Sequence, residues 1–181
     1  KFQKFPFRIF GAFSDRTNPR RMNYKRLNDL TGWAVWLIAS IVYLLTIEPT
    51  ASFWDCGEFI ASAYKLEVGH PPGAPMFMLL ARLFSMFFPA AMAATAVNVM
   101  SAMASSFTIL FLFWSVTHMA RKLALSRLAE GVTGLSDGQR IAVLASGAVG
   151  ALAYTFSDSF WFSAVEGEVY ALSSLFTALV F

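Results

Sequence analysis

The sequence predicts an all-α integral membrane protein. Of its 181 residues, 57% are hydrophobic and only 14% are charged, whereas soluble domains carry about 25% charged residues. The mean hydropathy is +0.57, and long apolar tracts alternate with short polar segments. A helix needs roughly 20 apolar residues to cross a bilayer. We therefore expect four membrane-spanning helices and one further helix that lies along the membrane surface.

The composition also argues against several classes of function. Cys56 is the single cysteine, which excludes an internal disulfide and a cysteine-cluster metal site, and His70 and His118 lie in separate parts of the chain. The net charge of +3 does not indicate a nucleic-acid partner, because the basic residues flank the apolar tracts, where orientation signals occur. No cofactor is predicted. A divalent metal is compatible with the sequence, but no motif indicates one.

The N-terminal segment 1–29 is basic and is expected on the cytoplasmic side or at the membrane surface. It holds eight lysines and arginines interleaved with five phenylalanines, a pattern that suits an anionic leaflet or a plain topogenic signal. The first span is predicted at 30–47, capped near Asn28 or Asp29, with Trp33 and Trp36 at the interface.

The apolar tract 74–88 is compatible with two topologies, and charge favours one of them. It is short for a span and contains Arg82. If it crossed the membrane, the basic loop 118–140 would face outward, against the positive-inside bias. We therefore predict a juxtamembrane helix at 74–88 inside an outer loop 48–92.

The remaining spans are predicted at 93–117, 141–156 and 168–181, separated by the inner loop 118–140 and an outer loop 157–167. With this topology the inner segments hold twelve basic and four acidic residues. The outer segments, counted with Glu168 at the start of the last span, hold two basic and seven acidic residues. The sequence begins without Met and stops within the last apolar run. We therefore expect the chain to be part of a longer protein.

The first outer loop carries the candidate site, because it concentrates acidic side chains next to aromatic ones at a membrane edge, where desolvating a charge is costly. Asp55 and Glu58 are three residues apart, so a helical turn there places both carboxylates on one face. Such a pair suits acid–base chemistry, although the spacing is equally typical of acids at a helix N-terminus. The stiff run after His70 fixes that histidine at the membrane surface, either to meet a lipid phosphate or as a turn residue.

Three sequence blocks, in this order, resemble the GT-C glycosyltransferases, and most closely the bacterial relatives of the transmembrane protein O-mannosyltransferase family. They are D-C-G-E-F-I-A at Asp55–Ala61, H-P-P-G-A-P at His70–Pro75, and S-F-W-F-S-A-V-E-G-E-V-Y-A-L at Ser159–Leu172. The resemblance covers residues 30–181 and implies that they form the N-terminal part of a multi-span GT-C fold.

The resemblance implies transfer of a mannose-like sugar, with inversion, from a polyprenyl-phosphate donor to a Ser or Thr hydroxyl of a secreted or membrane protein. It gives Asp55 the role of general base and Glu58 that of an assistant. It also implies that Glu166 and Glu168 contact the sugar or the acceptor. We further predict that His70, Lys65, Arg82 and Tyr170 bind donor or acceptor.

The expected location is the bacterial inner membrane with a periplasmic site, or the endoplasmic reticulum membrane in a eukaryote. A membrane carrier and a non-catalytic assembly subunit are the alternative functions. Apart from Glu168, which opens the last span, the predicted spans contain no acidic or basic residue. This disfavours a carrier, because carriers place ionisable groups within the membrane.

Overall fold

The computed structural model describes residues 23–71, 73–128 and 134–181, and within these ranges all regular structure is helical. Most of the basic N-terminal segment, residues 1–22, therefore lies outside the described residues. The helices are α1 (Tyr24–Leu45), α2 (Cys56–Lys65), α3 (Pro75–Ser85), η1 (Ala90–Met92), α4 (Ala93–Ser126), α5 (Asp137–Thr155), α6 (Asp158–Val165) and α7 (Val169–Val180). The all-α prediction is confirmed.

Helix α1 begins earlier than the predicted span 30–47. Asn23, not Asn28 or Asp29, is the N-cap, and its side chain accepts a hydrogen bond from the backbone N–H of Arg26 at 3.2 Å. A cap of this kind satisfies one of the free N–H groups of the first turn. The polar residues before Leu30 therefore form the first turns of the helix instead of a separate segment.

Helix α4 is the central element, since α1, α5 and α7 all pack against it. Small and weakly polar side chains, such as Ser101, Ala102 and Ser105, are fully buried along it, and such residues let neighbouring helices approach closely. Two glycines show how close the approach is. A Cβ at Gly32 of α1 would lie 2.6 Å from the indole nitrogen of Trp114, and one at Gly147 of α5 would collide with Thr117.

The segment predicted as the inner loop, 118–140, contains the end of α4 and the start of α5. Helix α4 continues to Ser126, and α5 begins at Asp137. Ser136 and Gln139 form a reciprocal capping box at the start of α5, which fixes that end of the helix in the sequence. The apolar content of 93–117 could mark a membrane span, but helix-forming polar residues extend α4 beyond the apolar tract.

The segment predicted as the outer loop, 157–167, contains helix α6. Helices α5 and α6 are bent by 65° at the break between them. Ser157 has an extended backbone conformation, and Asp158 occupies the first turn of α6, where an acidic side chain is stabilised by the helix dipole. The apolar residues that follow pack back onto the bundle: Phe160 and Ala164 are buried.

Among the described helices, α1 and the run 90–126 are long and apolar enough to cross a membrane, and the bent pair α5–α6 makes a third crossing if it counts as one span. The predicted fourth span, 168–181, corresponds to α7, an apolar helix of 12 residues. The structure therefore supports two or three crossings by length and composition, fewer than the four predicted. Within the segment 74–88, predicted as a juxtamembrane helix, the structure has the helix α3, of 11 residues.

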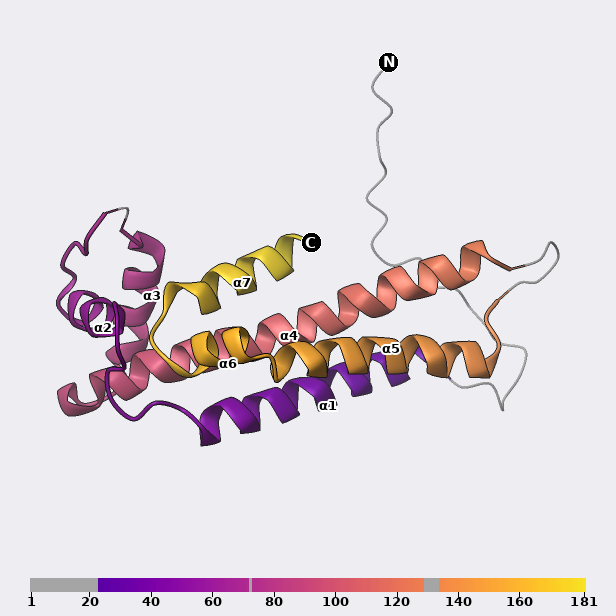
Figure 1. The fold of residues 1–181 in the computed structure, drawn as a ribbon, viewed down its shortest axis with the longest axis horizontal. Coiled ribbons are helices and arrows are strands. Elements are labelled where there is room, and N and C mark those ends of the chain that lie inside the picture. The colour runs from indigo at the N-terminus through magenta and orange to yellow at the C-terminus, as the bar shows by residue number, and fades with distance from the viewer. Residues whose placement is uncertain (1–22, 72, 129–133) are drawn as a thin grey trace, which may run out of the picture.

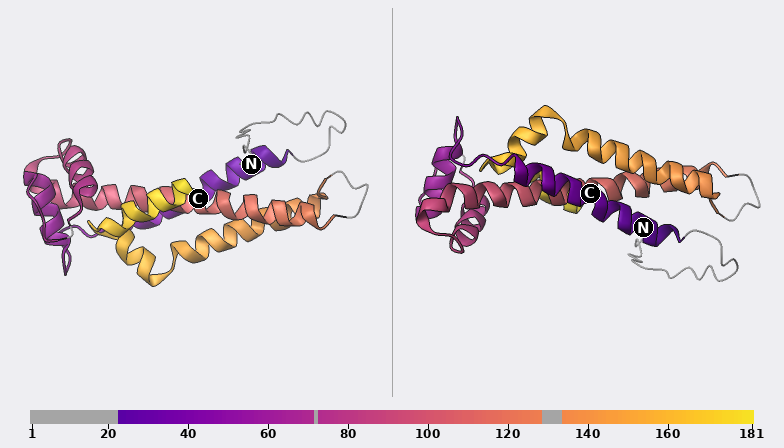
Figure 2. Two further views of the ribbon diagram at one scale, coloured as in Figure 1. Left: turned by 90° about the horizontal axis from the view of Figure 1, so that it is seen from above. Right: turned by 90° about the horizontal axis from the view of Figure 1, so that it is seen from below.

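The helices form an elongated bundle with a small helical cap at one end (Figure 1). The cap consists of α2 and α3, which contact the first part of α4, and it remains at that end when the molecule is turned (Figure 2). The link between α6 and α7 lies at the same end (Figure 1). Two contacts join the end of α1 to α6: Trp161 Nε1 donates to Thr46 Oγ1 at 3.0 Å, and the Glu48 amide donates to the Val165 carbonyl at 3.0 Å.

Candidate functional site

Asp55 and Glu58 lie at the N-terminus of α2. Asp55 is the N-cap residue, but its side chain makes no capping hydrogen bond, and Glu58 is in the first turn. The residue before them, Trp54, has a φ of 64°, a left-handed conformation that side-chain-bearing residues rarely adopt. The chain therefore turns sharply into the helix and leaves the Asp55 carboxylate available to other partners.

The turn around His70 is attached to α2 through Glu58. One Glu58 oxygen accepts a hydrogen bond from the His70 backbone N–H at 2.6 Å, and the other lies 2.9 Å from His70 Nδ1. The second imidazole nitrogen, Nε2, lies 3.8 Å from Asp55 Oδ2. Gly73, with a φ of 73°, closes the turn by donating its N–H to the His70 carbonyl at 2.9 Å. His70 is thus placed between the two carboxylates.

Glu58 and the imidazole of His70 perturb each other. Hydrogen bonds from the His70 amide and imidazole lower the pKa of Glu58. The hydrogen bond to Glu58, and to a smaller extent the charge of Asp55, raise the pKa of His70. Since an opposite charge favours the ionised form of each partner, the arrangement favours a protonated imidazole beside an ionised Glu58.

Glu166 and Glu168, in the link between α6 and α7, meet α2 from the other side. The Cys56 thiol lies 3.2 Å from Glu166 Oε2 and 3.5 Å from Glu168 Oε1. Glu166 is 2% exposed, and burial raises the pKa of both carboxyl groups and raises that of Cys56 to about 12. The thiol is therefore the proton donor in this contact, and it fixes the start of α2 against the α6–α7 link.

Asn98 of α4 forms hydrogen bonds with the segment between α1 and α2. Its side-chain amide donates to the Glu48 carbonyl at 2.7 Å and to the Thr50 carbonyl at 2.9 Å. Its Oδ1 lies 3.1 Å from the position that a Cβ on Gly167 would occupy. Asn98 therefore holds the segment that leads from α1 toward Asp55, and the α6–α7 link lies directly against it.

A cavity of about 430 Å³ lies between α2, the His70 turn and the start of α7. Four of the residues predicted to form the site line it, together with aromatic and small side chains. The full lining is Trp54, Asp55, Phe59, His70, Gly73, Ala74, Phe162, Ser163, Glu168, Val169 and Tyr170. Segments more than 100 residues apart in the sequence thus contribute to one polar and aromatic cavity.

The other predicted site residues do not line this cavity. Glu58 contacts the imidazole of His70, and Glu166 is buried against the thiol of Cys56. Lys65 lies 3.8 Å from Glu67 at the end of α2, and the guanidinium of Arg82 lies 4.9 Å from the centre of the Tyr64 ring. Both cations are therefore engaged within the α2–α3 cap.

Sequence reasoning did not assign a role in the site to Trp54, Cys56 or Asn98. A polar residue within an apolar tract was the available signal for Asn98, because such residues are costly in a membrane unless they have a partner. Cys56 gave no comparable signal. Its role depends on Glu166, which is 110 residues away.

Asp55, Glu58 and His70 also offer metal-ligand atoms that all lie within 4.8 Å of one another. Two carboxylates and an imidazole are a chemically reasonable set for a divalent cation. However, both Glu58 oxygens already engage His70, and the imidazole itself lies between the two carboxylates.

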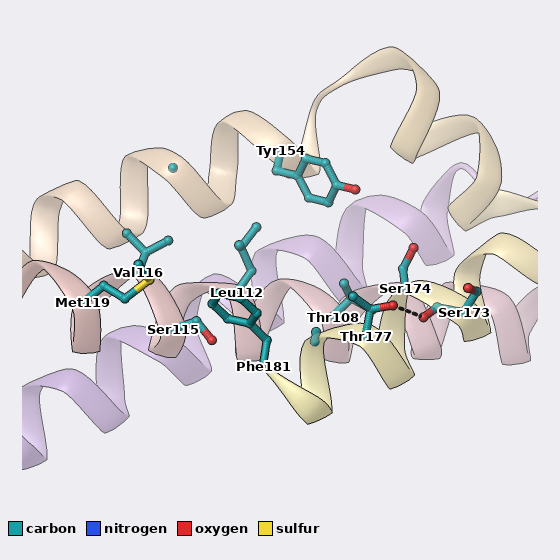
Figure 3. A pocket seen from close by; sticks show the side chains of 12 residues that line it. Thr108, Leu112, Ser115, Val116, Met119, Tyr154, Ser173, Ser174, Thr177 and Phe181 are labelled. Carbon is teal, nitrogen blue, oxygen red and sulfur yellow. Dashed lines mark hydrogen bonds between the residues drawn. The ribbon is translucent and has the colours of Figure 1, made fainter.

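A second cavity, of about 520 Å³, lies between α4, α5 and α7 (Figure 3). Its lining is almost entirely apolar or hydroxylic, and Tyr154 is the only titratable side chain among the residues that line it. The hydroxyl of Thr177 bonds within its own helix, to the Ser173 carbonyl at 2.9 Å. Acid–base chemistry is therefore available at the cavity beside α2 and not at this one.

The chain matches a family model described as "Protein O-mannosyl-transferase TMEM260 N-terminal domain" over residues 55–181, a range that includes every residue of the cavity except Trp54. Among curated proteins it is 30% identical to protein O-mannosyl-transferase TMEM260 of Mus musculus over 147 residues, and 26% identical to protein O-mannosyl-transferase tmem260 of Dictyostelium discoideum over 153 residues. Each match covers 81% of this chain but only 18% and 16% of the respective relative. The chain thus spans less than a fifth of either relative. No solved structure matches it.

Proposed function

The chain belongs to the family of the protein O-mannosyl-transferase TMEM260 N-terminal domain, and on this premise we propose that it is the N-terminal membrane part of a glycosyltransferase with a GT-C fold. The enzyme moves a mannose-like sugar from a polyprenyl-phosphate donor to a Ser or Thr hydroxyl of a secreted or membrane protein. The reaction takes place at the outer face of a bacterial inner membrane or, equivalently, at the luminal face of the endoplasmic reticulum. Both named relatives are from eukaryotes, which favours the second location.

One observation carries the proposal: Asp55, His70 and Glu168 line a single cavity at the end of an apolar helix bundle. An enzyme that joins a lipid-linked sugar to a protein hydroxyl needs a polar reaction site next to the membrane. It also needs a group that takes up the hydroxyl proton and a cation that meets the phosphate.

Asp55 is the general base in this proposal. Its side chain is 57% exposed and is not used as a helix cap, so an oxygen is free to accept the proton of the acceptor hydroxyl. The hydroxyl oxygen attacks the anomeric carbon of the sugar as the bond from that carbon to the phosphate oxygen breaks. The phosphate leaves with the bonding electron pair. Because attack and departure occur on opposite faces, the anomeric configuration is inverted.

His70 meets the donor phosphate, and Glu58 keeps it positioned and protonated. The two hydrogen bonds from His70 to Glu58 fix the imidazole in orientation. A protonated imidazole stabilises the negative charge that gathers on the departing phosphate. Glu168 lines the cavity from the start of α7. Its carboxyl group is available there to hydroxyls of the sugar or the acceptor.

The distribution of acidic residues favours a transferase over a carrier. Among the described residues of α1, α4 and α5, the acids are Asp29 and Asp137. Both lie near the helix ends that are farther from the α2–α3 cap. Carriers place ionisable residues near the middle of the bilayer. The acids of this chain instead surround a cavity at one end of the bundle.

The proposal is tested with the intact protein in nanodiscs, supplied with polyprenyl-phosphate mannose and a Ser/Thr-containing peptide. Mass spectrometry should find peptide that has gained one hexose, and NMR of that product should show an anomeric configuration opposite to that of the donor. Omission of the peptide is the control for donor hydrolysis. Absence of transfer to any hydroxyl peptide, together with intact donor, would contradict a transferase.

A further inference from the structure

Trp54 is the most unusual residue next to the candidate site. Its side chain is 88% exposed, and its backbone has a φ of 64°. No hydrogen bond or ring contact within the described part of the chain explains this position. A non-glycine residue is held in the left-handed region only where the surrounding structure imposes it, and such residues gather at functional sites.

Trp54 shares the cavity with two other exposed aromatic side chains. Phe162 is 55% and Tyr170 is 64% exposed, and all three line the cavity. Trp54 comes from the segment before α2, whereas Phe162 belongs to α6 and Tyr170 to α7. Two separate parts of the chain therefore bring aromatic faces to one polar cavity.

Interfacial anchoring in the membrane is the other common use of an exposed tryptophan. The neighbouring Phe53 allows the two uses to be compared, because it is 86% exposed but is not part of the cavity lining. A membrane anchor has no need of carboxylates beside it. Trp54 instead faces a cavity that contains the carboxylates of Asp55 and Glu168 and the imidazole of His70.

This combination matches the chemistry of a sugar. One face of a pyranose ring presents C–H bonds whose hydrogens are slightly positive, and the face of an aromatic ring is slightly negative. The hydroxyls at the sugar edge need hydrogen-bond partners, which carboxylates and imidazole supply. A cavity of this kind, lined by aromatic and other apolar side chains with a few polar groups, is the usual form of a small-ligand site.

We propose that Trp54, with Tyr170, forms an aromatic subsite that stacks on the pyranose ring of the donor sugar and orients its anomeric carbon toward Asp55. The inference rests on the proposed function and adds to it a binding residue for the glycosyl group. It assigns recognition of the sugar to the cavity aromatics and recognition of the phosphate to His70. Trp54 precedes Asp55 directly, so stacking positions the sugar next to the base.

Equilibrium binding tests this division, since it needs no turnover. The intact protein in nanodiscs is titrated with two probes, polyprenyl-phosphate mannose and the same polyprenyl phosphate without sugar. The variants are Trp54→Ala, which removes the ring, Trp54→Phe, which keeps an aromatic face, and Phe53→Ala, the matched exposed control. Tyr170→Ala and Tyr170→Phe form the second pair.

An aromatic stacking contact contributes roughly 0.5–1.5 kcal/mol, so Trp54→Ala should weaken binding of the mannose-bearing probe about two- to twelvefold. It should leave binding of the sugar-free probe unchanged. Trp54→Phe should restore most of the affinity, Tyr170→Phe should bind like the wild type, and Phe53→Ala should change neither Kd. Because Trp54 is exposed, its truncation should not lower the thermal stability.

Two results would overturn the subsite alone. One is equal weakening of both probes by Trp54→Ala, which would make Trp54 a lipid anchor. The other is an unchanged Kd for the mannose-bearing probe in both Trp54→Ala and Tyr170→Ala. If the wild-type protein binds neither probe, the proposed function fails and the subsite fails with it, so the two failures are distinguishable.

Discussion

Replacement of Asn98 by alanine should loosen the segment that leads into the candidate site. The Asn98 side chain is 1% exposed, and it donates to the carbonyls of Glu48 and Thr50 at 2.7 and 2.9 Å. Each such hydrogen bond contributes about 0.5–1.5 kcal/mol, and a buried carbonyl that loses its partner adds to the cost. Together the two bonds amount to about 1–3 kcal/mol, and water replaces the one at Thr50 more readily, because Thr50 is exposed whereas Glu48 is half-buried.

Amide hydrogen exchange of the intact protein measures this loss locally. The Glu48 amide is a built-in reporter, since it donates to the Val165 carbonyl at 3.0 Å and exchanges only when the segment opens. A loss of about 1–3 kcal/mol corresponds to exchange that is about 5- to 140-fold faster. The matched control is Thr108→Ala, which removes a 3.0 Å hydrogen bond made within α4 to Ala104. The reasoning is refuted if Asn98→Ala accelerates exchange less than about twofold, or no more than Thr108→Ala.

Three further predictions concern the site and its orientation. His70→Ala should raise the KM for donor more than it lowers kcat, with Glu67→Gln as the control. Because Glu58 raises the pKa of His70, wild-type donor affinity should be full below about pH 6.5 and decline as the pH rises through the raised pKa, whereas His70→Ala should show no such decline. Chelation with EDTA should leave transfer intact, since His70 already supplies the positive charge between the carboxylates; loss of activity that Mn²⁺ restores would instead assign the cluster to a metal. A cysteine placed at the exposed Val68 should react with an impermeant reagent from the outer or luminal side and one at Ser126 should not, and the reverse pattern would invert the topology.

The acidic part of the site was predictable because it depends on local sequence. Asp55 and Glu58 are three residues apart, and the run after His70 contains the prolines and glycine that fix a turn. These features predicted that a helix start and a rigid histidine would occur in one loop. The structure adds the hydrogen bonds that join His70 to Glu58.

The other wall of the cavity was only partly predictable, because it depends on contacts between distant segments. The resemblance pointed to Glu166 and Glu168 together, and both carboxyl groups meet the Cys56 thiol. Their exposure differs: Glu166 is 2% exposed, whereas Glu168 also lines the cavity. Alternate residues of an extended link point to the same side, but their spacing in the sequence does not say how deeply each is buried. Hydropathy likewise located the apolar tracts, yet the helix ends were set by Asn23 and Ser136 through capping bonds that hydropathy does not register.

The central claim is that the Asp55 carboxylate takes up the acceptor proton, and Asp55→Asn tests it most directly. The amide keeps the size of the side chain and can still accept a hydrogen bond, but it no longer acts as a base. A positioned general base contributes about a hundred- to ten-thousand-fold, so the intact variant should bind polyprenyl-phosphate mannose normally and lose at least about two orders of magnitude in transfer rate. Glu58→Gln should lose less, because Glu58 acts through His70. Transfer by Asp55→Asn at close to the wild-type rate would contradict the account and move the search for the base to Glu58 or Glu168.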